Sequence, residues 1–188
     1  MGRSPGDKCR QERHPRDVWI NFELAGLLEK LSRRDEAIRF YTAARALRPE
    51  TAHKLAHALE KRGHSDEAIA VFLDLKELRP GNATHLECLG DLLKDKGRSQ
   101  EAGEVFELAL AASREEVRLK SGDAHAQFHL CNVLKRQGKL DEAVAAYRAA
   151  IRLKPDDAHA HIHLGAILCD VKHDYTGAEA EFREAIRL

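Results

Sequence analysis

The sequence predicts an all-α fold, a solenoid built from five helix-turn-helix repeats. An alanine returns at intervals of 31, 34, 41 and 35 residues, and an aromatic residue follows each of these alanines four positions later. A leucine precedes the first four alanines by thirteen residues and the fifth by fourteen. The three recurring positions are occupied by Leu24, Leu55, Leu89, Leu130 and Leu164; by Ala37, Ala68, Ala102, Ala143 and Ala178; and by Tyr41, Phe72, Phe106, Tyr147 and Phe182. Self-similarity near 34 residues is typical of stacked helical hairpins.

Each repeat is expected to contain a first helix (helix A), a tight turn and a second helix (helix B). Glycine adopts a positive φ at little cost, so we expect the turns at Gly63, Gly97 and Gly138. An Asp-Glu or Ser-Gln pair then places acidic or capping groups at the positive end of helix B. Prolines that stop a helix follow helix B in three repeats: Pro49, Pro80 and Pro155. The recurring alanine and aromatic are predicted to be core.

Two repeats depart from the regular length. The interval of 31 residues lacks about one helical turn, so the second helix A is expected to begin late, just after Pro49. The interval of 41 residues adds about two turns near residues 113–122, which contain good helix formers and no proline. We therefore expect the third helix B to run from about Gln100 to Lys120 and to project from the array, with Val117 and Leu119 near its end.

The fourth repeat resembles the tetratricopeptide repeat (TPR) family. That family has a leucine, a small residue, a second large apolar residue, Ala-x3-Phe/Tyr and then proline, which here are Leu130, Cys131, Leu134, Ala143, Tyr147 and Pro155. The resemblance covers residues 18–188 and implies an α-solenoid coiled as a right-handed superhelix. It places the repeats at about 18–48, 49–82, 83–123, 124–157 and 158–188. Residues 1–17 have no apolar core and are predicted to form a disordered leader.

Bulk composition narrows the classes of partner. The chain carries 31 basic and 31 acidic residues, so nothing in its net charge favours nucleic acid or an anionic membrane surface. No apolar run approaches the ~20 residues that a spanning helix needs. The four cysteines show no Cys-x-x-Cys spacing, which indicates free thiols in a reducing compartment, so we expect a cytoplasmic protein.

The resemblance implies that a protein or peptide ligand lies in a concave groove lined by helix A of each repeat. Carried over position by position, the partner-binding residues are Phe22, His53, Lys54, His57, Glu87, Asp91, His125, Phe128, His129, Asn132, Lys135, Arg136, His159, Ile162 and His163. The same positions of the first two repeats also include Glu23, Gly26, Glu29, Lys30 and Lys61. These positions match neither of two known groove chemistries. One is the carboxylate clamp of chaperone-binding TPR domains, and the other is the asparagine ladder of O-linked N-acetylglucosamine transferase arrays.

The groove is instead rich in histidine. Three pairs are spaced i, i+4 and therefore share a helix face: His53/His57, His125/His129 and His159/His163. We interpret them as solvated groove side chains and predict no metal and no cofactor. A zinc or nickel site is the alternative, since two helical ligands often have this spacing. Because histidine titrates near pH 6.5, acidic peptides are expected to bind more tightly at about pH 5.5 than at about pH 7.5.

No catalytic constellation is present: the sequence has no GxSxG, no phosphate-binding loop and no HExxH. We therefore predict a protein–protein interaction module and no enzyme. Two alternatives stay open. The segment around residues 17–59 resembles the TPR tails of bacterial serine/threonine protein kinases, which implies a regulatory or substrate-docking segment of a larger signalling enzyme. Self-association through uncapped ends is the other, because Trp19 and Ile20 at one end and Phe182 and Ile186 at the other are apolar.

Overall fold

The computed structural model describes residues 17–188, which form two compact units that divide after Pro80. The predicted leader, residues 1–17, lies outside the described residues except for Asp17. Residues 17–188 contain ten α-helices and one short 3-10 helix, joined by turns, and these residues form no strand. None of these helices is both long and apolar enough to cross a membrane.

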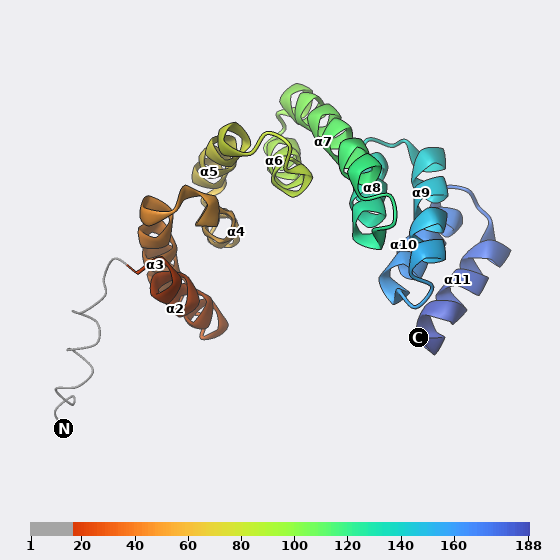
Figure 1. Cartoon of the computed structure of the whole chain (residues 1–188), viewed down its shortest axis with the longest axis horizontal. Helices are drawn as coiled ribbons and strands as arrows, with labels where there is room; N and C mark the ends of the chain where they lie inside the picture. Colours follow the sequence, from red (N-terminus) through yellow and green to blue (C-terminus); the bar gives the residue numbers. More distant parts are fainter. Residues whose placement is uncertain (1–16) are drawn as a thin grey trace. The chain divides into compact units, whose positions relative to one another are not determined.

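Unit 1 consists of two helical hairpins. The first pairs α2 (Val18–Lys30) with α3 (Arg34–Leu47), and the second pairs α4 (Ala52–Lys61) with α5 (Ser65–Leu78) (Figure 1). The 3-10 helix η1 (Pro49–Thr51) joins the hairpins and occupies the first turn of the second repeat. The late start of this helix A is therefore confirmed.

Unit 2 consists of three hairpins. They pair α6 (Ala83–Asp95) with α7 (Ser99–Leu119), α8 (Ala124–Arg136) with α9 (Leu140–Leu153), and α10 (Ala158–Asp170) with α11 (Tyr175–Arg187). Helix A of each hairpin is α2, α4, α6, α8 or α10, and helix B is α3, α5, α7, α9 or α11. The predicted all-α fold of helix-turn-helix repeats is confirmed within each unit.

The recurring alanines and aromatics form the core, as predicted. All five alanines are buried, and so are the first four aromatics, whereas Phe182 on α11 is half-buried. Small residues are required where an aromatic ring meets the facing helix. A Cβ atom placed on Gly90 of α6 would lie 2.5 Å from Cε1 of Phe106, which is closer than two carbon atoms approach.

The turns between helix A and helix B use a left-handed residue. Gly63, Gly97 and Gly138 have φ values of 88°, 76° and 71°, so their predicted role is confirmed. The first and last hairpins have no glycine at this point. Ser32 and His173 take the same conformation there, with φ of 59° and 55°, although side chains disfavour it.

Side-chain caps stand mainly at the start of helix A. Asp17, Asn82, Asp123 and Asp157 each accept a hydrogen bond from a backbone amide of the first turn of their helix. Helices α3, α5, α7 and α9 have no such side-chain cap, but each carries an acidic residue in its first turn, which favours the positive helix end.

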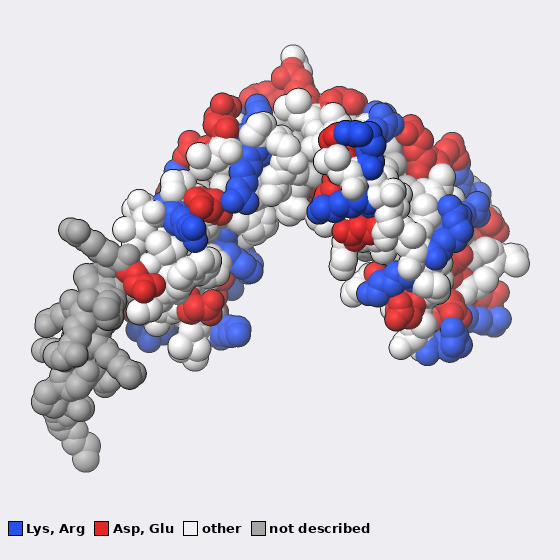
Figure 2. All heavy atoms as spheres, in the orientation of Figure 1, with Lys and Arg blue, Asp and Glu red and all other residues white. Residues whose placement is uncertain are grey.

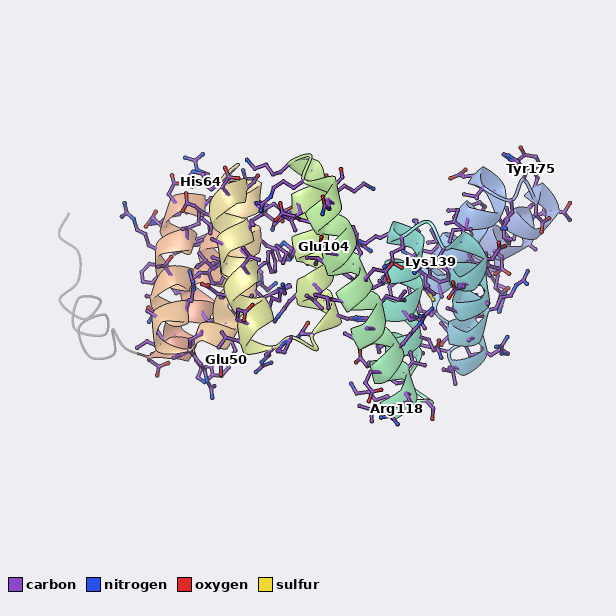
Figure 3. The ribbon with its side chains drawn as sticks, turned by 90° about the horizontal axis from the view of Figure 1, so that it is seen from above. Glu50, His64, Glu104, Arg118, Lys139 and Tyr175 are labelled. Atoms are coloured by element: carbon purple, nitrogen blue, oxygen red, sulfur yellow. The ribbon has the colours of Figure 1, made fainter. Side chains whose placement is uncertain are left out.

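Helix α7 is 21 residues long, against 13 or 14 for the other helices of unit 2, so the predicted long helix B is confirmed. Figure 3 shows Arg118 at its projecting end. Two local ion pairs stabilise the extension, Arg118 with Glu115 at 2.6 Å and Lys120 with Glu116 at 3.0 Å.

Candidate functional site

The helix-A face of unit 1 contains a hollow of about 460 Å³ between α2 and α4. Its lining residues come mostly from positions predicted to face a ligand, and they include Phe22 and Lys54, which the sequence analysis predicts to bind a partner. The full set is Phe22, Glu23, Gly26, Glu29, Lys30, Arg34, Tyr41, Lys54 and Lys61. We call this set the helix-A hollow. The structure therefore brings predicted residues of two successive repeats around one open space.

An aromatic pair forms one wall of the helix-A hollow. The rings of Phe22 and Tyr41 meet edge to face, with centroids 5.6 Å apart. The Tyr41 hydroxyl donates a hydrogen bond of 2.8 Å to Oε2 of Glu29, whose other carboxylate oxygen lies 3.4 Å from Lys61 Nζ. Burial and the neighbouring Glu29 carboxylate raise the pKa of Tyr41, so its hydroxyl keeps its proton and remains a donor.

Cations outnumber carboxylates in the helix-A hollow, with Lys30, Arg34, Lys54 and Lys61 against Glu23 and Glu29. Lys61 is paired with Glu29. Lys30, Arg34 and Lys54 form no ion pair with any residue in the described part of the chain. The hollow thus combines an aromatic ring, a surface suited to apolar side chains, with three cations that pair with no described residue and are suited to carboxylates.

The predicted histidine pair of α4 is in contact. The rings of His53 and His57 have centroids 4.7 Å apart and both meet the buried Phe72 of α5, at 5.6 and 5.7 Å. Nδ1 of His57 also lies 2.9 Å from a carboxylate oxygen of Glu60. Within either unit taken by itself, no three described His, Cys, Asp or Glu side chains converge as metal ligands would.

In unit 2, the predicted groove cation Arg136 is bound by two carboxylates. Its guanidinium on α8 lies 3.2 Å from Glu87 and 2.9 Å from Asp91, both on α6. Glu87 is only 8% exposed, and this burial raises its pKa to about 7, although Arg136 opposes the rise. The Arg136 side chain therefore ties two helices A together, and its guanidinium is already paired with carboxylates of this chain.

A second cluster joins α8, α9 and α10 of unit 2. The centroid of the buried Tyr147 ring lies 6.0 Å from Phe128 and 5.9 Å from His163, which it meets nearly parallel. The Tyr147 hydroxyl donates a hydrogen bond of 3.1 Å to Oδ1 of Asn132. Burial, with Lys135 and His159 nearby, lowers the pKa of His163, so this ring stays neutral to a lower pH than an ordinary histidine.

The remaining predicted residues are more open. His125, Lys135, His159 and Ile162 are exposed on their helices, and Nδ1 of the half-buried His129 lies 3.4 Å from the Thr84 hydroxyl. Figure 2 shows acidic and basic side chains interspersed on the visible face of each unit, as the zero net charge suggests.

One polar contact escaped the sequence analysis. His161 is buried, with Nδ1 2.7 Å from a carboxylate oxygen of Glu181 and Nε2 3.1 Å from the backbone carbonyl of Pro155. Its position in the helix could have indicated that His161 is buried. His161 lies one residue after Ala160 and three before Leu164, both core positions of α10.

Comparisons with known proteins agree with this architecture. The family description "Tetratricopeptide repeat" matches residues 53–117, and "TPR repeat" matches residues 132–170. No curated protein sequence matches the chain.

Solved structures with the same fold span nearly the whole chain. A thermophilic TPR protein of Thermus thermophilus is 20% identical, with a TM-score of 0.65 over 91% of each chain. MamA from Desulfovibrio magneticus RS-1 is 22% identical, with a TM-score of 0.60 over 91% of this chain and 94% of that one. YrrB, described as a TPR protein with an unusual peptide-binding site, is 25% identical, with a TM-score of 0.54 over 96% of this chain and 90% of that one.

Proposed function

The chain belongs to the tetratricopeptide repeat family, whose fold serves as a protein-interaction scaffold, and we propose that it holds a partner peptide on its helix-A face. The observation that carries the proposal is the helix-A hollow of unit 1. Its residues come from the two successive helices A and, through Arg34 and Tyr41, from α3. The half-buried ring of Phe22 and three exposed cations that pair with no described residue line the hollow. The described peptide-binding site of YrrB supports a peptide as the class of ligand.

The chemistry of the hollow favours an acidic peptide with an apolar side chain. The half-buried Phe22, which packs on the buried Tyr41, offers ring surface. Lys30, Arg34 and Lys54 offer charge that no described residue neutralises. An exposed ion pair contributes up to about 1 kcal/mol, or about fivefold in affinity, so two or three of them select acidic sequences without binding them tightly. This role is one of binding and involves no catalytic step.

The test is selection from a displayed library of random dodecapeptides with the full chain as bait. We expect the selected peptides to be enriched in Asp or Glu beside an aromatic or aliphatic residue. Their affinity should fall about fivefold or more in Lys54→Glu and in Phe22→Ala. Lys76→Glu on α5 is the matched control, because it makes the same charge change outside the hollow. Peptides that bind all four proteins equally would refute the proposed site.

Localisation in the cytoplasm is part of the proposal. Cys131 and Cys169 carry free thiols, which a reducing compartment maintains.

Self-association is a second candidate, favoured by the exposed apolar residues of two helices. Trp19, Ile20 and Leu27 are exposed on α2, and Tyr175 and Ile186 are exposed on α11. Sedimentation velocity over a wide concentration range tests it. A constant sedimentation coefficient would reject self-association, whereas a rise that Leu27→Glu abolishes would support it.

A further inference from the structure

The shortened second repeat leaves a hollow on the helix-B side of unit 1. Helix α4 has 10 residues, whereas α2, α6, α8 and α10 each have 13, and η1 replaces the missing turn. Three residues of α-helix are about 4.5 Å long. At the shortened end lies a cavity of about 580 Å³ between the last turns of α3 and α5. Figure 3 labels Glu50 of η1 at this end of unit 1, opposite His64.

The lining of this cavity is largely apolar. Ala46, Pro49, Ala52 and Leu78 supply its apolar surface, and Thr42, Arg45, Asp74 and Glu77 complete it. We call these eight residues the helix-B pocket. Leu78 is 53% exposed there, although leucine gains from burial. The volume lies within the range of pockets that hold small ligands or side chains of a partner.

The charge of the helix-B pocket favours a basic ligand. Arg45 and Asp74 form an ion pair across it, so they neutralise each other. Glu77 forms no ion pair with any other described residue, which leaves one free carboxylate at the rim. The C-terminal turns of α3 and α5 both border the pocket, and helix C-termini attract cations through their unpaired carbonyls.

We propose that the helix-B pocket binds a segment of a partner protein in which a large apolar side chain stands next to a lysine or arginine. The apolar side chain covers Leu78 and Ala46, and the basic group pairs with Glu77. The pocket shares no residue with the helix-A hollow, and the two have opposite charge preferences. The chain therefore offers two docking sites in unit 1 that select different partner sequences.

The experiment records the backbone amide signals of the full, isotope-labelled chain during titration with three capped tripeptides. The probe is acetyl-Phe-Arg-Arg-amide; acetyl-Phe-Glu-Glu-amide and acetyl-Gly-Arg-Arg-amide test its charge and its ring. We expect the probe to shift the signals of Ala46, Ala52 and Leu78, and to bind at least about fivefold more tightly than either companion.

Two variants locate the binding site. Ala46→Phe fills the pocket from an exposed position, and Glu77→Lys reverses its free charge, so each should weaken the probe about fivefold or more. Ala111→Phe and Glu104→Lys make the same changes on exposed positions of α7, outside the pocket, and should leave binding unchanged.

Three results would overturn the proposal: no shift at the pocket amides, equal binding of the Phe-Glu-Glu companion, or equal binding by both pocket variants and both controls. A loss in Glu77→Lys alone still supports it if circular dichroism shows that Ala46→Phe is unfolded. Acidic peptides selected for the helix-A hollow should bind both pocket variants normally, so failure of one site is distinguishable from failure of the other.

Discussion

Gly90 gives a sharp test of the packing between α6 and α7. A Cβ atom at this position would meet Cε1, Cδ1 and Cζ of Phe106 at 2.5, 2.8 and 2.8 Å. The ring is buried and cannot swing into solvent. We expect Gly90→Ala to force α6 and α7 apart, because overpacking a core typically costs about 1–3 kcal/mol.

A matched glycine separates this cost from helix propensity. Alanine is favoured over glycine inside a helix by about 1 kcal/mol, so part of the damage in Gly90→Ala is offset. Gly103 lies inside α7, is exposed, and would place its Cβ more than 4 Å from any neighbour. Gly103→Ala should therefore stabilise the protein. The propensity gain is common to both variants, so the difference between them, about 1–3 kcal/mol, measures the contact with the Phe106 ring.

Urea unfolding followed by far-ultraviolet circular dichroism measures both variants. Phe106→Leu completes a double-mutant cycle, because the smaller side chain leaves room for a methyl group at position 90. Gly90→Ala should then cost clearly less in the Phe106→Leu background than in the wild type. If Gly90→Ala is as stable as Gly103→Ala, or costs the same in both backgrounds, the close approach at Gly90 is wrong.

Three further predictions concern single positions. Ser32→Gly and His173→Gly should each raise the free energy of unfolding by about 1 kcal/mol, because both residues hold a left-handed conformation that glycine adopts freely. Thermal melts test this, and unchanged melting midpoints would contradict it. Ser113 is fully buried and its hydroxyl has no hydrogen-bond partner among the described residues, so Ser113→Ala should be neutral or stabilising in the same melts. A loss of more than about 1 kcal/mol would contradict this and indicate that the hydroxyl has a partner. Burial raises the pKa of Glu87 from 4.5 to about 7, so the folded state holds this proton more tightly than the unfolded state. The stability that this group contributes is present below about pH 4.5 and is lost as the pH rises to about 7. The free energy of unfolding of Glu87→Gln should therefore rise relative to that of the wild type over this pH range, by up to about 3 kcal/mol in urea titrations. A difference between the two proteins that stays constant with pH would refute the raised pKa.

The helices and hairpins followed from the sequence because their signals are local. Each of the five recurring alanines is followed by an aromatic residue four positions later, which is helical spacing. The interval of 41 residues predicted the bounds of α7 to within one residue at each end. The left-handed turn residues could be predicted only where the sequence has glycine. Ser32 and His173 have side chains that disfavour this conformation, so their residue types gave no signal for it.

The candidate site was less predictable, because it depends on residues far apart in the chain. Position within the repeat placed Phe22 and Lys54 on the helix-A face, and both line one hollow. It did not show that Arg136 is bound by two carboxylates some 45 residues earlier, because charged side chains choose partners by distance in space. The helix-B pocket could not be predicted either, because the shorter repeat spacing does not show which residues line the pocket.

The left-handed Ser32 also bears on how ready the first hairpin is to receive a ligand. Its conformation costs about 1–2 kcal/mol. This cost narrows the free-energy difference between closed molecules, with α2 packed on α3, and open molecules, in which this packing is lost and Ser32 can relax. Phe22 belongs to α2 and Tyr41 to α3, so the ring pair of the helix-A hollow is complete only in closed molecules. Every 1.4 kcal/mol changes the ratio of closed to open molecules tenfold, and the apparent affinity for a ligand falls with the closed fraction. Ser32 does not line the helix-A hollow, yet its conformation lowers the fraction of molecules in which this proposed site is complete. The glycines of the inner turns impose no such cost on their hairpins.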